Sequence, residues 1–339
     1  GGVLVRFERA FAQFAETGHA VAFNSGTSAL YAAIRALGLR PGDEVMLPDY
    51  GFHGMAAAVL ATGAKVAVCD VEPAGLTMSP AALAEAITPR TKAVLVHHPW
   101  GVPADLAALR AVTDLPIVSD ASHAHGALCR DRPLAAGADI TCYSLGMGKL
   151  ISGGELGCAV TDRNDLRDAM VIEGHVNRVP HDLLASPWTG NAVGLKLRPH
   201  AAALTLASGQ LRRFDEKAAR IAETAREIET AAVEAGFTVQ SPPCPAERAY
   251  WQIHLRCPTP EARDGVVSAL REAGMPARAD EYRPSLQHQP LFSWPAHIGR
   301  LVPRACPTAA QAAATGLLIT APAGLDRASR DGLAAAFAT

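Results

Sequence analysis

The sequence predicts an α/β fold with a large, mostly parallel sheet domain and a smaller C-terminal α+β domain. In the first half of the chain, short continuous apolar runs alternate with stretches of helical periodicity. Strands buried on both faces have such continuous runs, and helical crossovers join parallel strands. After Gly236 the composition changes, which indicates a second unit. The chain has 339 residues, 49% of them hydrophobic, and is long enough to bury a large core.

The elements of the first half follow from these patterns in chain order. Seven apolar runs are expected to form strands: Ala20–Phe23, Glu44–Leu47, Lys65–Cys69, Ala93–Val96, Pro116–Ser119, Ile140–Tyr143 and Cys158–Thr161. Three stretches between them are expected to form helices: Ser28–Leu37, Phe52–Ala61 and Pro80–Ala86. Because the two kinds of element alternate, we expect crossover connections and a mixed or mostly parallel sheet.

The second half begins with a long helical stretch, His200–Ala235, which has Arg, Glu and Asp on one face. We interpret it as the link between a large domain, residues 1–215, and a small domain, residues 216–339. Expected elements that follow are two strands and two helices, at Phe237–Gln240, Tyr250–Arg256, Pro260–Ala273 and Ala309–Ala314.

Composition excludes several classes of protein. The net charge is −2 and only 19% of residues are charged, so there is no basic surplus for a dedicated nucleic-acid binder. No apolar run reaches membrane-spanning length, so we expect no membrane partner. The seven cysteines are odd in number and form no C-x-x-C pair. This pattern predicts no disulfide framework, no zinc site and a reducing, cytoplasmic location.

Lysines are scarce, so any chemistry that needs an amine has few candidates. The five are at positions 65, 92, 149, 196 and 217, and those at 65, 92 and 217 resemble ordinary solvated lysines. Lys149 differs because it lies in the glycine-rich segment Ser144–Gly157, directly after an expected strand. Burial in a tight turn would lower the pKa of this lysine and favour the free amine of a Schiff base. An incidental lysine in a surface loop remains the alternative.

A second candidate is Asp120, which follows the apolar run Leu115–Ser119 and opens the segment Asp120–Gly126. Ligands of open α/β sheets lie at the carboxyl ends of strands, and a carboxylate there can hold a ring nitrogen protonated. The alternative is a helix N-cap. His123 and His125 lie in the same segment, but no third ligand is nearby, so we predict no metal.

Two further segments fit a phosphorylated, planar cofactor. Asn24–Leu30 places small residues at an expected helix start, where free N–H groups and the helix dipole suit a phosphate. Its alternative is a simple helix cap. Pro48–His53 carries Tyr50 and Phe52, and an aromatic face there could stack on a ring. The alternative for Phe52 is a core position.

The order of these segments resembles that of fold-type I enzymes that use pyridoxal 5′-phosphate. More narrowly, the sequence resembles the DegT/DnrJ/EryC1/StrS family of sugar aminotransferases over most of its length. The motifs that carry this resemblance are Phe7-Glu8, Asn24–Leu30, Pro41–Val45, His98–Gly101 with Asp105, Asp120–Gly126, Ser144 with Lys149 and Glu155, Gly194–Arg198 with Gln210-Leu211, and Tyr282–Pro284 with His288–Pro290.

The resemblance implies a role for each candidate around the cofactor ring. Lys149 would bind the cofactor as a Schiff base and later carry the proton. Asp120 would pair with the pyridine nitrogen, and Phe52 would stack on one face of the ring. His123 would lie against the ring or its hydroxyl group.

It also implies a phosphate site that two subunits share. Gly26, Thr27, Ser28 and the hydroxyl of Ser144 would bind the phosphate from one subunit. Lys196, with Arg198 beside it, would reach the phosphate from the neighbouring subunit. A homodimer with sites at its subunit interface is therefore expected.

The function that the resemblance implies is transamination from glutamate or glutamine to a keto acceptor. The acceptor would be a nucleotide-linked ketosugar or related cyclic ketone, in secondary-metabolite or glycan biosynthesis. One open alternative is different chemistry with the same cofactor: a dehydratase, epimerase, lyase or carbon–carbon bond-forming enzyme. Another is a non-catalytic domain of this fold, which would have no need of Lys149 and Asp120.

Residues that choose the acceptor are expected in the loop Gly174–Thr189. Its candidates for substrate contact are His175, Asn177, Arg178 and Trp188. The alternative is that they are plain surface residues of the loop.

Overall fold

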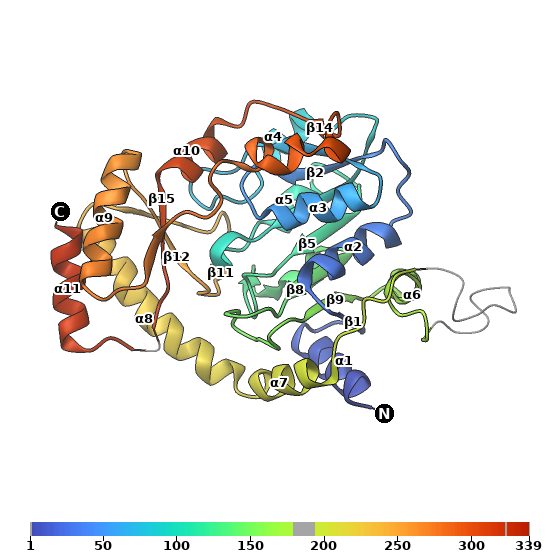
Figure 1. Cartoon of the computed structure of the whole chain (residues 1–339), viewed down its shortest axis with the longest axis horizontal. Helices are drawn as coiled ribbons and strands as arrows, with labels where there is room; N and C mark the ends of the chain where they lie inside the picture. The colour runs from blue at the N-terminus through green and yellow to red at the C-terminus, as the bar shows by residue number, and fades with distance from the viewer. Residues whose placement is uncertain (1, 179–193, 323, 339) are drawn as a thin grey trace, which may run out of the picture.

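The computed structural model describes residues 2–178, 194–322 and 324–338. Its largest feature is an eight-stranded sheet with helices packed against it (Figure 1). The strands of this sheet are β1 (His19–Phe23), β2 (Glu44–Pro48), β3 (Lys65–Cys69), β4 (Thr91–His97), β5 (Ile117–Asp120), β8 (Ile140–Ser144), β9 (Gly157–Thr161) and β14 (Leu301–Val302). The seven strands expected in the first half are therefore confirmed.

The sheet has the order β1-β9-β8-β5-β4-β2-β3-β14, and only β9 runs against the others. The large mostly parallel sheet predicted from the sequence is thus confirmed. The carboxyl ends of β4, β5 and β8 meet at one edge, because these three strands are parallel neighbours. His97 and Asp120, the last residues of β4 and β5, lie in register there.

Helices pack against the sheet. They are α1 (Val3–Phe14), α2 (Gly26–Ala36), α3 (His53–Ala61), α4 (Pro80–Ala86), α5 (Leu106–Arg110) and α6 (Asn164–Gly174). Of these, α2, α3 and α4 lie where the sequence predicts them. Local chemistry explains their starts: Ser25 caps α2 and accepts from the Ser28 amide, and Ser79 caps α4, which has proline in its first turn.

The second half forms a four-stranded antiparallel sheet with helices beside it (Figure 1). Its strands are β10 (Thr238–Val239), β12 (Ile253–Arg256), β13 (Ala277–Ala279) and β15 (Gly316–Ile319), and its helices are α9 (Pro260–Glu272) and α11 (Arg327–Phe337). The chain also returns to the large sheet, where β14 pairs with β3 and α10 (Pro307–Thr315) packs on the large core. A domain boundary at residue 215 therefore stays a prediction.

The single long helix expected at 200–235 is instead two helices, α7 (Ala201–Leu211) and α8 (Phe214–Glu234). No proline or glycine separates them, so the sequence carries no local stop there. Tertiary packing explains the break. Helix α7 packs against α1, whereas α8 continues to the four-stranded sheet and α11 (Figure 1).

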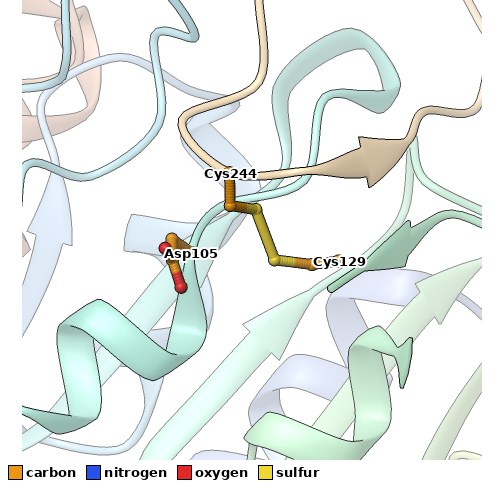
Figure 2. Close-up of side chains that lie close together, drawn as sticks. All are labelled: Asp105, Cys129 and Cys244. Carbon is orange, nitrogen blue, oxygen red and sulfur yellow. A yellow bond between two sulfur atoms is a disulfide. The ribbon is translucent and has the colours of Figure 1, made fainter. Parts of the chain in front are cut away.

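A small three-stranded sheet joins the two halves and holds an unexpected disulfide. Its strands are β6 (Leu128–Cys129), β7 (Arg132–Pro133) and β11 (Ala246–Glu247). Cys129 pairs with Ala246 in register, and a disulfide links Cys129 to Cys244 (Figure 2). The expectation of no disulfide was wrong for this pair, because the cysteines are 115 residues apart in sequence and only the fold brings them together.

Asp105 lies beside this disulfide, so three metal-ligating types of side chain come together (Figure 2). However, the Asp105 carboxylate binds Arg130 at 2.6 Å and caps α5 through the Ala108 amide. Salt bridge, cap and disulfide together account for the polar atoms of this group.

The remaining helical elements are short 3-10 turns: η1 (Pro99–Gly101), η2 (Leu134–Gly137), η3 (Leu286–His288), η4 (Pro290–Ser293) and η5 (Pro295–His297). Among the described helices, none combines the length and the apolar character that crossing a bilayer requires.

Candidate active site

Lys149 lies in the turn between β8 and β9, where the sequence predicts a reactive amine. Its Nζ lies 3.5 Å from the ring centroid of Trp251, and the indole N–H of Trp251 donates to the Gly148 carbonyl at 2.9 Å. Burial lowers the pKa of Lys149 to about 8, while the charges of Asp120 and Glu281 oppose this shift. A much larger fraction of this amine is therefore neutral at physiological pH than of an ordinary lysine.

Asp120 ends β5 and is 3% exposed. Its Oδ1 accepts from the Ser122 amide at 3.0 Å, and Oδ2 lies 3.7 Å from His97 Nδ1. On its other side, His97 Nε2 lies 3.2 Å from the hydroxyl of Tyr282. Burial lowers the pKa of His97, so a neutral imidazole lies between the carboxylate and the tyrosine. The Ser122 amide thus holds one oxygen of Asp120, and His97 lies beside the other without a hydrogen bond.

His123 lies three residues after Asp120 and is also buried. Its Nδ1 accepts from the Trp100 amide at 3.2 Å, which assigns the ring proton to Nε2. Its ring centroid lies 3.9 Å from that of Trp251. Burial lowers the pKa of His123 well below its usual range. The side chain is therefore a neutral hydrogen-bond donor through Nε2.

The start of α2 and the end of β8 form a narrow cradle. A Cβ on Gly26 would lie 2.7 Å from Ser144 Cβ, so only glycine allows this approach. The Ser28 amide already donates to Ser25 Oγ at 3.1 Å. In this first helical turn, the amides without an intrahelical acceptor are then those of Gly26 and Thr27. Together with the Ser144 hydroxyl, they are suitable ligands for a phosphate.

Phe52 lies next to this cradle. A Cβ on Gly54 would meet the Phe52 ring at 2.5 Å and Thr27 Oγ1 at 3.1 Å, which puts the ring beside Thr27. Phe52 is 43% exposed, an unusual state for a phenylalanine in this well-buried chain. Tyr50 differs, because it is fully buried and accepts from the Trp100 indole at 2.8 Å.

A cavity of about 540 Å³ opens beside Phe52. Its lining includes His53, Glu281, Tyr282 and Arg283. The charge of Glu281 raises the pKa of Lys149, and the hydroxyl of Tyr282 lies within hydrogen-bond distance of His97. The cavity therefore adjoins the site of Lys149 and Asp120. Its volume suits a small polar molecule.

The structure does not bring Lys196 to this site within one chain. Lys196 is exposed, and its backbone forms an isolated bridge with His175. Arg198 is exposed as well. A role for either at a neighbouring subunit's phosphate stays a prediction.

The proposed acceptor loop has structural roles at two positions. His175 is buried, with Nε2 at 2.7 Å from the Ala22 carbonyl oxygen, and Arg178 pairs with both oxygens of Glu8 at 2.8 Å. These partners hold α6 against the large sheet and leave neither side chain free for a substrate. Asn177 is exposed, and Trp188 lies outside the described residues.

Sequence reasoning missed His97 and Trp251. His97 could have been found, because an expected parallel strand ends beside the one that carries Asp120. Trp251 is 102 residues from Lys149 and comes from the second half of the chain, so no local pattern connects them.

An amine of lowered pKa, a buried carboxylate and a helix N-terminus thus meet at the carboxyl ends of parallel strands. This fold and arrangement are those of fold-type I transferases. The chain belongs to the DegT/DnrJ/EryC1/StrS aminotransferase family, whose sequence model matches residues 1–337.

Relatives agree with this assignment. The chain is 41% identical over 174 residues to a dTDP-3-amino-3,4,6-trideoxy-alpha-D-glucose transaminase of Streptomyces venezuelae, covering 50% of this chain and 46% of that protein. It is 34% identical over 265 residues to an L-glutamine:2-deoxy-scyllo-inosose aminotransferase of Streptoalloteichus tenebrarius, covering 75% and 62%. These matches span less than two thirds of either relative's length.

Solved structures share the fold over the whole chain. A 3-amino-5-hydroxybenzoic acid synthase superposes with a TM-score of 0.89 at 26% identity and covers 100% of this chain and 90% of its own. The S. venezuelae protein DesV, solved with a ketimine intermediate, has a TM-score of 0.86 at 29% identity and covers 100% and 89%.

Proposed function

We propose that this protein is a pyridoxal-phosphate-dependent aminotransferase that moves an amino group from glutamate or glutamine to a keto acceptor. The acceptor is a nucleotide-linked ketosugar or a related cyclic ketone of secondary-metabolite or glycan biosynthesis. One observation carries the proposal: burial lowers the pKa of the Lys149 amine to about 8, and the charge of the buried Asp120 is near enough to oppose this shift. Support for the substrates comes from relatives named for a dTDP-sugar and for a scyllo-inosose.

The residues present fit pyridoxal 5′-phosphate. Gly26 packs so closely on Ser144 that no side chain fits there, and this brings the Ser144 hydroxyl beside the amides of Gly26 and Thr27 at the positive end of α2. His97 Nδ1 is buried and lacks a hydrogen-bond partner among the described residues, which leaves it free to steady Asp120. When bound, the cofactor supplies an electron sink for the amino-acid carbon.

Each residue then has a task that its geometry allows. The Asp120 carboxylate would accept a hydrogen bond from the cofactor's ring nitrogen and stabilise its positive charge. His123 would donate through Nε2 to the cofactor, since its Nδ1 is occupied by the Trp100 amide. Phe52 would cover one face of the ring, and Ser144 with the first turn of α2 would hold the phosphate.

Lys149 binds the cofactor covalently and serves as the base. Once the amine of the donor has displaced it from the cofactor, the free Nζ, whose pKa is lowered to about 8, would take the proton from the donor's α-carbon and could later return it to the acceptor's carbon. Trp251 and the Gly148 carbonyl it binds limit where this amine can move. The cavity next to Phe52 would receive the donor and the acceptor in turn.

The same proposal includes a homodimer and a cytoplasmic location. Lys196 and Arg198 are exposed cations directly after the undescribed segment, and a neighbouring subunit could place its phosphate site against them. The proposal for Lys196 rests on the family resemblance, because its side chain has no contact with the site of its own chain.

Borohydride reduction tests the assignment. The purified protein with bound cofactor should absorb visible light, and reduction should attach the cofactor to the peptide that contains Lys149. Lys149→Ala should lose both properties, with Lys92→Ala, an exposed lysine, as the matched control. Normal turnover by Lys149→Ala would refute the proposal.

Incubation with glutamate separates transamination from other chemistry on the same cofactor. A transaminase should release stoichiometric 2-oxoglutarate and leave the aminated form of the cofactor on the protein. Without that half-reaction, for glutamate and glutamine alike, a dehydratase, epimerase or lyase would be the better assignment.

A further inference from the structure

A second and larger cavity, of about 650 Å³, lies between α8 and the segment 239–250, in the region of α8 and β11 in Figure 1. Its lining includes His125 and Leu150 but no residue of the proposed cofactor site. The volume is within the range of small-molecule sites. It is also far larger than the ~30 Å³ that one bridging water occupies, so a single buried water does not account for it.

Polar atoms without partners are concentrated in the wall of this cavity. His125 is 1% exposed, Gln240 is 4% exposed and the Arg248 side chain is 7% exposed. Among the described residues, both ring nitrogens of His125, Gln240 Oε1, and Arg248 Nε and Nη2 make no hydrogen bond of good geometry, although the Ser144 backbone acts on the pKa of His125. Buried polar groups almost always have partners, so whatever enters this cavity, water or a ligand, would be expected to bind these atoms.

Only one nitrogen of the Arg248 guanidinium group, Nη1, is hydrogen-bonded to described residues. Nη1 donates to Glu229 Oε1 at 2.6 Å, and Tyr250 donates to the other oxygen of Glu229 at 3.3 Å. The guanidinium carbon lies 4.6 Å from the ring centroid of Tyr250. The free atoms Nε and Nη2 form the edge of arginine that binds a carboxylate through two parallel hydrogen bonds.

Gln240 and His125 would best bind a neutral polar group. Gln240 donates through Nε2 to the Gly75 carbonyl at 3.0 Å, so only its oxygen remains, and that oxygen accepts. Burial lowers the pKa of His125 to about 3, and its ring is neutral with one donor and one acceptor. A hydroxyl group matches both side chains, because it donates and accepts.

Apolar residues also line the cavity, among them Leu150, Phe214, Ala218, Ile221, Ala222 and Val239. Further charged and polar residues of the lining are Arg226, Glu229, Ser241 and Glu247. An occupant that satisfies the polar atoms should therefore also have an apolar body, since hydrophobic surface is removed from water when it binds.

We propose that this cavity is a second ligand site, separate from the cofactor, for a small hydroxycarboxylic acid with an apolar body. The carboxylate binds the free edge of Arg248, and the hydroxyl group binds Gln240 Oε1 or His125. Leu150 and His125 follow Lys149 and His123 closely in the chain, so an occupant contacts the same two loops that carry the proposed catalytic groups.

Calorimetry on the cofactor-loaded protein tests the site with three matched probes. 4-Hydroxybenzoate should bind saturably, with one site per chain. Benzoate, which lacks the hydroxyl group, should bind several-fold more weakly. 4-Hydroxybenzamide, which lacks the charge, should bind at least tenfold more weakly. Inorganic phosphate serves as the fourth arm, and phosphate binding as tight as that of 4-hydroxybenzoate would refute an apolar-bodied ligand.

Two variants locate the binding. Arg248→Lys keeps the positive charge but removes the two parallel N–H donors of the guanidinium group. The affinity for 4-hydroxybenzoate should therefore fall at least tenfold. Ala222→Leu fills the cavity from α8 and should abolish binding, whereas Thr230→Leu, on an exposed part of the same helix, should not change it. A melting curve for each variant verifies that it folds. Unchanged affinity in a folded Ala222→Leu variant would place the ligand elsewhere, and absence of saturable binding to the native protein would refute the site.

Discussion

Two histidines of one short segment, His123 and His125, are both buried, yet their surroundings are opposite. His123 faces the proposed cofactor site, where the Trp100 amide uses its Nδ1 and Trp251 packs on its ring. His125 lines the larger cavity, and its nitrogens make no hydrogen bond of good geometry among the described residues, although the Ser144 backbone acts on its pKa. The comparison teaches that burial by itself does not identify a functional group. Whether the polar atoms of a buried side chain have hydrogen-bond partners is more informative.

The largest expected effect is on the His123 side, at the carboxylate that ends β5. Asp120→Asn keeps an oxygen for the Ser122 amide but removes the negative charge. We expect the rate of transamination to fall by roughly 10²–10³-fold, the usual cost of losing one preorganised electrostatic group. Steady-state kinetics measures this effect. Asp114→Asn, an exposed aspartate just before the same strand, is the control, and an equal loss in both variants would contradict a specific role.

The second prediction concerns the pH at which Lys149 reacts. Burial favours the neutral amine, so the fraction that can attack the cofactor rises with pH and levels off above about 8. An ordinary lysine would level off about two units higher. Stopped-flow absorbance can follow the addition of cofactor to the cofactor-free protein and so measure this rate as a function of pH. A rate that still rises steeply between pH 9 and pH 10 would show that the amine is not perturbed.

His123→Leu should destabilise the protein even without cofactor. The substitution leaves the Trp100 amide buried without an acceptor, which costs about 1–3 kcal/mol in the free energy of unfolding. Urea unfolding of the cofactor-free protein measures the change. His123→Gln restores an acceptor, and its stability should recover in part. Identical losses in the two variants would indicate that ring packing, and not the hydrogen bond, is what matters.

His125→Leu should have the smallest effect and the opposite sign. It replaces two unpartnered nitrogens by apolar surface of similar size, and the free energy of unfolding should rise by up to about 1 kcal/mol. The same urea experiment compares it with His123→Leu. A loss of stability as large as that of His123→Leu would mean that water or another partner satisfies His125 in solution.

Much of the fold follows from local pattern. The apolar runs of the first half form strands of the large sheet because continuous hydrophobicity requires burial on both faces. Failures occur where packing overrides local propensity. The helix expected at 200–235 breaks at Arg212-Arg213, since α7 and α8 pack on different parts of the molecule.

The sequence by itself determined the sheet and the order of Lys149, Asp120 and Gly26 along it, because strand-end positions and glycine-rich turns are local properties. It also carried the family resemblance that the family match confirms. Tertiary structure alone decided which groups surround them: His97 beside Asp120, Trp251 over Lys149, and Cys129 joined to Cys244. Arg248, Gln240 and His125 likewise meet around one cavity only in the folded chain. The physical reason is that hydrogen bonds and burial depend on distance in space, and most of these partners come from segments far apart in the sequence.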